Sequence, residues 1–474
     1  MSKFNLICAI CILTATLAFG GVSKKDESPD KPKENSGQRG KDKIQNAVQR
    51  ALRLTDLTDI ADAHPQDLHP TTRRWVALAS VLAQRTPVLI LDEPTASFDL
   101  AETQRMSTLL NTLKRASYTI LLISHDMQFV AEHADDICVI RSLHGDSVNH
   151  PQSVYQMNTG SILMGNPSVG SWVAYGLGSE NQNMPAFVVL PDPGGGLKGG
   201  PPAWGSGYLS AAYQGVTMRP GASPILDLKP QPEVSFQQQQ LDLSLIQALN
   251  QRHAKQRDHD DQLTARVKAY EMAFRMQTEA PGLVDISQET NQTQRMYGID
   301  QEHTREFGQR CLLARRMIER DVRFVQLYSG DTNGWDAHAD VDKNHTEYCA
   351  RTDKPVAGLL QDLKQRGLLE DTLIIWGGEF GRMPMSEQGR GRDHNPWGFC
   401  AWLAGAGIAG GRAYGATDEI GLRAVEDRVS VNDFHATLLH LLGIDHYDLT
   451  HYHNGLDKRL TGPDEAEVVR GLIG

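Results

Sequence analysis

Two short apolar runs, each ending on polar residues, set the pattern of the first third of the chain. They are Pro87–Asp92 and Thr119–Ser124, and helical patterns lie before and between them. An apolar run of about four to eight residues bounded by turn signals is consistent with a strand buried on both faces. In an open parallel sheet the residues that follow such strands meet at one edge. The pattern therefore predicts an α/β segment over residues 44–140, with polar residues gathered at its strand ends.

Alternation of helices and strands resumes beyond Asp135, after loops rich in Gly and Pro. Helical patterns cover residues 241–277, 304–320, 354–366 and 432–442, and strand patterns cover residues 322–327, 373–376 and 399–403. Strands that alternate with helices in this way are typical of a doubly wound sheet. The sequence therefore predicts a second α/β domain over residues 135–474.

The first 20 residues have a different pattern. A Lys near the start is followed by an uncharged run from Leu6 to Phe19 and by small residues at Ala18 and Gly20. This order predicts a secretory signal peptide over residues 1–20. Residues 21–43 have almost nothing to bury, which predicts a disordered linker.

Composition and hydropathy narrow the expected location and partners. No apolar run reaches the roughly 20 residues that a membrane-spanning helix needs, so we expect no transmembrane span. The protein should be secreted or periplasmic, or cytoplasmic if the signal is not used. A net charge of -11 without a concentrated basic patch excludes nucleic acid as an expected partner. The six cysteines form neither a zinc box nor a disulfide framework, and the oligomeric state stays open.

Three motifs at the strand ends of the first segment resemble those of ABC transporter ATPases. In order along the chain they are Leu91-Asp-Glu-Pro-Thr95, like the Walker B motif, Ser97-Phe-Asp99, like the D-loop, and Ser124-His-Asp126, like the switch histidine. The resemblance implies that Asp92 holds Mg²⁺ through water, Glu93 polarises the attacking water and His125 contacts the γ-phosphate. Residues 44–140 thus resemble the C-terminal half of an ABC ATPase domain.

The phosphate-binding half of that domain is not found in the sequence. A P-loop needs Gly-x-x-x-x-Gly-Lys-Ser/Thr, whose backbone amides and Lys neutralise the phosphates, and no such stretch occurs. Where the family has Leu-Ser-Gly-Gly-Gln, this chain has Leu68-His-Pro-Thr-Thr72, so Pro and Thr replace the glycines that approach the nucleotide. We therefore expect no ATP hydrolysis by this segment alone, and ATP with Mg²⁺ is not an expected cofactor.

Carboxylates and histidines flank the predicted strands of the second domain. They are Asp336 and His338 after 322–327, Glu379 after 373–376, and His394 before 399–403. Such a mixed set of oxygen and nitrogen donors suits Zn²⁺, Mn²⁺ or a similar divalent ion. Arg382 and Arg392 lie beside these residues in sequence and are candidates to hold an anionic substrate.

Four collinear motifs make the second domain similar to a sulfatase-like family of unknown function in the alkaline phosphatase superfamily. The motifs are Trp335-Asp-Ala-His338, Gly378-Glu-Phe-Gly-Arg382, Gly391-Arg-Asp-His394 and Asp433-Phe-His-Ala-Thr437. The resemblance implies an alkaline phosphatase-like doubly wound sheet with a metal site at Asp336, His338, Glu379 and His394. The implied metals are Zn, Mn, Ca or Mg. The implied substrate is a phosphate or sulfate ester of a small anionic molecule or a sugar.

Two departures from that family stand out. Its first strand ends in a loop with Gly-Gly-Pro-Ser and an Asp that supplies a metal ligand, and this strand is predicted to be missing, with the ATPase-like segment in its place. The stretch Asn149–Gly160 resembles the nucleophile helix, but His150 stands near the position of the usual Ser, Thr or modified Cys. His150 is therefore a candidate nucleophile, metal ligand or substrate contact.

Three functions are compatible with these patterns. A metal-dependent hydrolase-like protein fused behind a partial ATPase segment is favoured. An incomplete ABC-type ATP-binding subunit is the second, and saturable binding of Mg²⁺-ATP would support it. A composite binding protein without catalytic activity, whose halves do not cooperate, is the third.

Overall fold

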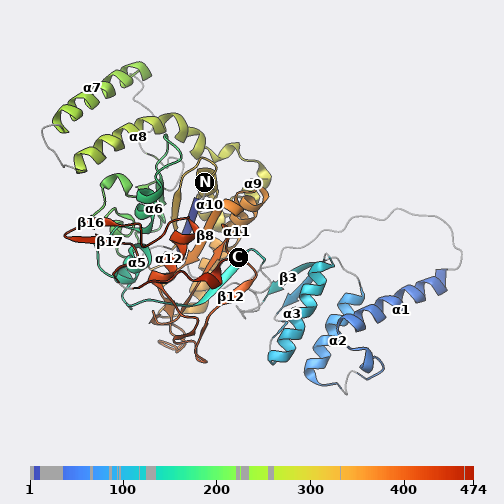
Figure 1. Cartoon of the computed structure of the whole chain (residues 1–474). Coiled ribbons are helices and arrows are strands. Elements are labelled where there is room, and N and C mark those ends of the chain that lie inside the picture. Colours follow the sequence, from blue (N-terminus) through green and yellow to red (C-terminus); the bar gives the residue numbers. More distant parts are fainter. Residues whose placement is uncertain are drawn as a thin grey trace. The chain divides into compact units, whose positions relative to one another are not determined.

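The structure of the chain is a computed structural model that describes most of the residues (Figure 1). The described residues are 5–10, 36–64, 68–84, 88–92, 94–95, 98–116, 118–123, 135–219, 225, 234–254, 261–330, 333–463 and 465–474. The chain divides into two compact units, one of Met1–Ala15 with Asp136–Gly474 and one of Thr16–Asp135. Among the helices so described, none is both long enough and apolar enough to cross a membrane.

In the described residues of the smaller unit there are two parallel strands and three α-helices. Its elements are α1 (Ser36–Leu54), the 3-10 helix η1 (Thr58–Ile60), α2 (Pro70–Ala83), β2 (Val88–Asp92), α3 (Leu100–Arg115) and β3 (Thr119–Ile123). Trp75, Leu89 and Leu110 are buried in its core. Asp99 of the D-loop-like motif accepts a hydrogen bond from the Glu102 amide and so caps α3. The α/β prediction for this segment is confirmed.

A nine-stranded sheet organises the larger unit, in the order β12-β4-β11-β8-β1-β7-β5-β6 with β15 also beside β4. The strands are β1 (Asn5–Ile10), β4 (Ile137–His144), β5 (Phe187–Leu190), β6 (Val216–Thr217), β7 (Phe324–Tyr328), β8 (Thr372–Gly377), β11 (Phe399–Ala404), β12 (Arg412–Tyr414) and β15 (Val429–Ser430). Every pairing is parallel except those of β11 with β4 and β8. The doubly wound α/β sheet expected from sequence is confirmed.

The α-helices described in the larger unit are α5 (His150–Thr159), α6 (Val169–Leu177), α7 (Phe236–Ala254), α8 (Asp261–Val284), α9 (Asn291–Met296), α10 (Glu302–Ile318), α11 (Val341–Gln365) and α12 (Val431–Leu441). Helices α6 and α12 pack on one face of the sheet and α10 packs on the other. Ile375 of β8 belongs to the core that includes Trp172 of α6 and Phe434 of α12. The next residue, Trp376, meets Phe307 of α10, as expected because neighbouring side chains of a strand point to opposite faces.

Short elements complete the larger unit. The two-stranded pieces are β9 (Gly381–Arg382) with β10 (His394–Asn395), β13 (Ala416–Thr417) with β14 (Ala424–Glu426), and β16 (His451–His453) with β17 (Leu456–Lys458). The 3-10 helices are η3 (Pro201–Trp204), η4 (Ala211–Tyr213), η5 (Ile286–Gln288), η6 (Leu369–Asp371) and η7 (Arg470–Leu472). The helix expected over 241–277 is two helices, α7 and α8. Helix α11 begins well before the predicted residue 354 and contains Pro355 inside it.

The centre of the sheet corrects one expectation from the sequence. Strand β1 lies between β7 and β8 and is parallel to both, with the backbone of Ile7 opposite Val325 and Ile374. The prediction that the first strand is missing, and that the sheet is incomplete at its N-terminal side, is therefore wrong. A run of apolar residues satisfies a signal peptide and a central parallel strand equally well, so its hydropathy could not distinguish them. The signal peptide itself stays a prediction.

Helix α12 is joined to α5 through a buried histidine. The Nε2 atom of His435 lies 2.9 Å from the Met157 carbonyl oxygen and donates to it. Its Nδ1 atom is buried and has no hydrogen-bond partner among the described residues. A proton on Nδ1 would therefore be buried without an acceptor, which costs free energy. Burial accordingly lowers the pKa of His435 to about 4, although the hydrogen bond to Met157 opposes this.

We expect this histidine to make the fold sensitive to acid. The unfolded chain binds the proton near pH 6.5 and the folded chain only near pH 4. The contribution of neutral His435 to the free energy of unfolding is thus fully present above about pH 6.5. It falls by about 3 kcal/mol as the pH drops toward 4. Urea unfolding between these pH values checks this. In the variant His435→Gln, which can still donate to the Met157 carbonyl, the free energy of unfolding should fall less between these pH values. An equal fall in the variant and the wild type would contradict the prediction.

Candidate metal centre

The candidate site is assembled from residues at the ends of several core elements. Asp336 and His338 follow β7, and Glu379 follows β8. His394 lies in β10, which is paired with β9, and His150 is the first residue of α5 after β4. These residues are far apart in sequence, and the sheet brings them to one edge, as expected for a doubly wound fold.

Three imidazole rings converge on the carboxylate of Asp336. The Nε2 atoms of His150 and His338 both lie 2.9 Å from its oxygens, and that of His394 lies 3.3 Å away. The Nε2 atoms of His338 and His394 are 3.1 Å apart. The four residues offer ligand atoms that all lie within 4.8 Å of one another. One carboxylate and three imidazoles are a donor set that suits a divalent transition metal.

Each of the three rings is also held at its outer nitrogen. The acceptors of the Nδ1 atoms are Glu379 Oε1 at 2.7 Å for His150, Glu387 Oε2 at 2.6 Å for His338, and the Val148 carbonyl oxygen at 2.7 Å for His394. Histidines that ligate metals almost always donate their other ring N–H to such an acceptor, which fixes the orientation of the ring. The arrangement directs all three Nε2 atoms to the same point.

The two arginines predicted to hold an anion have different surroundings. Arg382 Nη1 lies 2.7 Å from Asp336 Oδ1. Arg392 Nη1 donates instead to the Gly391 carbonyl at 2.8 Å, and its backbone amide donates to the Ala337 carbonyl. Arg382 therefore belongs to the cluster around Asp336, whereas the contacts of Arg392 stabilise the loop that precedes His394.

Two residues of the candidate site were missed by sequence reasoning. Lys198 Nζ lies 2.7 Å from Asp336 Oδ2, and the loop that carries it follows β5. Glu387 is the acceptor behind His338. A Lys inside the glycine-rich stretch Gly194–Gly200 was a usable signal for a backbone loop that approaches a ligand. No sequence signal singled out Glu387, because its role depends on the orientation of a distant ring.

The charges in this cluster compensate one another. Burial disfavours the charged form of Asp336, but hydrogen bonds from His150, His394, Lys198 and Arg382 outweigh it and hold its pKa well below the usual range. Burial also opposes a charged His150, yet its hydrogen bonds to Asp336 and Glu379 raise its pKa above the ordinary value. Because a neutral ring can donate from only one nitrogen, the two carboxylates at Nδ1 and Nε2 favour an imidazolium at His150.

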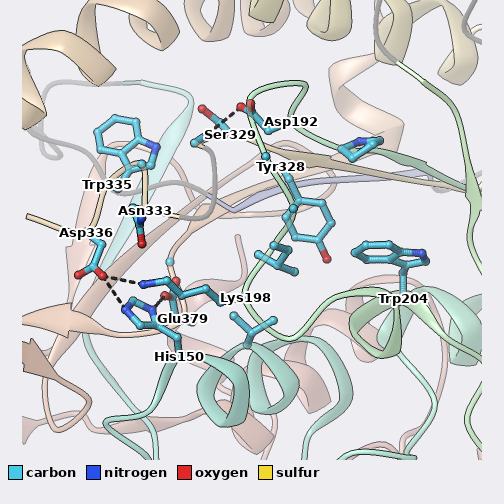
Figure 2. Close-up of a pocket in the computed structure, with 18 of the residues that line it drawn as sticks. His150, Asp192, Lys198, Trp204, Tyr328, Ser329, Asn333, Trp335, Asp336 and Glu379 are labelled. Carbon is cyan, nitrogen blue, oxygen red and sulfur yellow. Dashed lines mark hydrogen bonds and ion pairs between the residues drawn. The ribbon is translucent and has the colours of Figure 1, made fainter.

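A pocket opens beside this cluster (Figure 2). His150, Lys198, Asp336 and Glu379 lie together on one side of it, and the rings of Trp204 and Tyr328 lie on the other. Arg382 and Trp335 also line the pocket. Ligand pockets commonly combine an apolar wall with a few convergent polar groups. This one offers cationic side chains for an anionic group and aromatic surface for whatever is attached to it.

The residues predicted to bind nucleotide lie largely outside the residues that the structure describes. Asp92 is the last residue of β2. The side chain of Asp92, and Glu93 and His125 as a whole, fall outside the described residues. The nucleotide-binding role of these three residues stays a prediction.

Comparison with family models identifies the protein family of the chain. A family model described as "Protein of unknown function (DUF1501)" matches residues 83–473. The chain is a member of the DUF1501 family. All four residues of the candidate metal centre lie within the DUF1501 match.

Part of the chain is similar to ABC transporter ATP-binding proteins. The methionine import ATP-binding protein MetN of Pasteurella multocida (strain Pm70) is 38% identical over 130 residues, which are 27% of this DUF1501 chain and 36% of MetN. The chain thus spans about a third of the length of this relative.

Solved structures similar to the DUF1501 chain include two hydrolases. The PsFucS1 sulfatase from Pseudoalteromonas sp. is 11% identical, with 80% of this chain and 72% of that chain covered at a TM-score of 0.30. The phosphonate monoester hydrolase SpPMH from Silicibacter pomeroyi is 12% identical, with 81% and 75% covered at a TM-score of 0.32.

Proposed function

We propose that the larger unit is a metal-dependent hydrolase-like domain that acts on a phosphate or sulfate ester. The observation that carries this proposal is the convergence of three Nε2 atoms on Asp336, each ring being held from behind at Nδ1. The motifs around Asp336, Glu379 and His394 support the reaction class through their resemblance to the alkaline phosphatase superfamily.

Four residues would hold the ion: His150, Asp336, His338 and His394. Glu379, expected from sequence to be a ligand, would act from behind His150 as the acceptor of its Nδ1 proton. A bound divalent ion would polarise the ester and lower the pKa of an attacking water. His150 must release its Nε2 proton to become a ligand, so protons and metal compete for this ring.

Lys198 and Arg382 are the groups that would bind the anionic end of the substrate. Both line the pocket, and both now pair with Asp336 at 2.7 Å. Ligation of Asp336 would leave these two cations free to donate to the non-bridging oxygens of a phosphate or sulfate. Charge-assisted hydrogen bonds of this kind are roughly twice as strong as neutral ones. The aromatic wall would contact the leaving group and exclude water from that side.

His150 serves this proposal better as a ligand than as a nucleophile. Its Nδ1 atom is 2.7 Å from Glu379 Oε1, and its Nε2 atom is 2.9 Å from Asp336 Oδ2 and lies among the other ligand atoms. Both ring nitrogens are thus engaged by carboxylates. We therefore expect direct attack by water, without a covalent intermediate on this helix.

The test of the metal site is the metal content of the purified full chain, with Zn²⁺ and Mn²⁺ titrated separately. We expect stoichiometric binding that is lost in His338→Ala and in His394→Ala. The matched control is His303→Ala, an exposed histidine of α10. Glu379→Gln should still bind metal but about 10–100-fold more weakly, as for outer partners of metal ligands. A folded wild-type chain that binds no divalent ion would refute the proposal.

The reaction class is tested by metal-dependent release of an aryl alcohol from an aryl phosphate and an aryl sulfate. Lys198→Ala should raise KM more than it lowers kcat, because the side chain would bind the anion in both the ground state and the transition state. A chain that binds metal but cleaves neither ester would retain the metal centre and exclude these two substrate classes.

A further inference from the structure

Helix α7 exposes a stripe of leucines. Leu241, Leu245 and Leu249 follow one another at intervals of four residues, and 61%, 62% and 57% of their respective surfaces are exposed. At this spacing the three side chains lie on one side of a helix. Isolated exposed leucines are ordinary, but a contiguous apolar stripe indicates a contact surface.

The opposite side of α7 is the one that contacts the rest of the unit. Gln247 is half-buried and its Nε2 atom donates to Glu271 Oε1 of α8 at 2.7 Å. Leu243 and Asn250 are half-buried with it. At about 100° per residue these three positions are turned roughly 100–180° away from the leucines. The stripe therefore points away from α8, with which α7 forms a hairpin (Figure 1).

We propose that this stripe binds the same stripe of a second copy of the chain, with the two α7 helices antiparallel. A two-fold axis at the level of Gln247 places Leu245 of one copy opposite Leu249 of the other, because the two positions are equally far from residue 247. The same axis places Asp242 at the level of Arg252 of the other copy. Self-complementary contacts related by a two-fold axis are the common form of homodimer interface.

The charges on α7 favour this partner. Asp242 is the acidic residue of this helix, and Arg252 with His253 is its basic end. Asp242 is exposed, and within its own helix it accepts a hydrogen bond from Gln238. An antiparallel pair brings the acidic end of each helix to the basic end of the other, whereas a parallel pair would juxtapose like charges. A lipid surface fits less well, because membrane-surface helices are rich in Lys and Arg on the polar face.

The interface is small, so we expect a weak dimer with a Kd on the order of micromolar. Sedimentation velocity of the full chain from about 1 to 100 µM would show a concentration-dependent dimer. Leu245→Gln with Leu249→Gln should abolish it. Leu163→Gln is the matched control, because Leu163 is 65% exposed at a different place on the same unit.

A charge exchange separates this pairing from non-specific adhesion. Asp242→Arg alone and Arg252→Asp alone should each raise Kd at least about tenfold, because each places like charges together. The double variant Asp242→Arg, Arg252→Asp restores the complementarity and should restore the dimer. A wild-type chain that stays monomeric at 100 µM, a double variant without rescue, or a stripe that binds zwitterionic vesicles instead would overturn the proposal. Metal content is independent of these substitutions, so the two proposals fail separately.

Discussion

Deletion of residues 1–20 should unfold the larger unit. The backbone of β1 is paired with β7 from Leu6 to Ile10 and with β8 from Asn5 to Ile10. Each ladder hydrogen bond contributes a net free energy of about 1 kcal/mol, so the loss is on the order of 10 kcal/mol. The whole net stability of a domain is about 5–15 kcal/mol. Without β1, the strands β7 and β8 have no common neighbour.

Thermal melting and amide hydrogen exchange of the full and shortened chains check this expectation. In the shortened chain, the amides of β7 and β8 should lose their protection together. Deletion of residues 23–34, in the predicted linker, is the control and should leave the melting temperature unchanged. If the chain without residues 1–20 keeps its melting temperature and its protection, β1 is not an integral strand and these residues are a removable signal.

The result also tests the predicted signal peptide. Cleavage after Gly20 would remove β1 from the mature chain, so a cleaved signal and this central strand exclude each other. A chain that needs β1 for stability would retain its first residues.

The second large effect is expected from Asp336→Asn. The Asp336 carboxylate pairs with His150, Lys198 and Arg382, and 12% of its side chain is exposed. The amide keeps the shape but removes the charge that balances three cationic groups. Removal of one partner from a buried ionic cluster costs about 3–5 kcal/mol. Metal-free Asp336→Asn should therefore unfold at a lower urea concentration, and it should bind no metal.

Equilibrium unfolding in urea with a chelator present measures this cost. Asp342→Asn is the matched control, because its side chain is 78% exposed and its carboxylate pairs with an exposed Arg390 at 3.6 Å. The control should stay within about 0.5 kcal/mol of the wild type. An Asp336→Asn chain as stable as the control would mean that the cations around Asp336 are solvated, contrary to the cluster described above.

Much of the fold was readable from the periodicity of the chain. The apolar runs 322–327, 373–376 and 399–403 correspond to β7, β8 and β11, and α10 and α12 lie where helical patterns were expected. The antiparallel direction of β11 was not predictable, because strand direction depends on the connections and not on side-chain pattern. β1 was missed because its run of apolar residues also satisfies the pattern of a signal peptide.

The candidate site was predictable as a set of residue types but not as a set of roles. The sequence indicated Asp336, His338 and His394 through the strand ends and motifs that contain them. It could not distinguish the ligand role that we propose for His150 from the outer-acceptor role that we propose for Glu379, since both residue types occur in both roles. The difference lies in which ring nitrogen faces the cluster, and only tertiary packing determines that.

The position of β1 has a consequence for synthesis of the chain. Its backbone partners are Phe324 and Leu373 for Leu6, and the whole smaller unit is translated between them. Strand β1 thus leaves the ribosome long before its neighbours, while the smaller unit can fold as soon as it emerges. Pairings of such long sequence separation slow folding. During that interval an apolar segment stays accessible, and chaperones or export factors that bind such segments can compete with closure of the sheet.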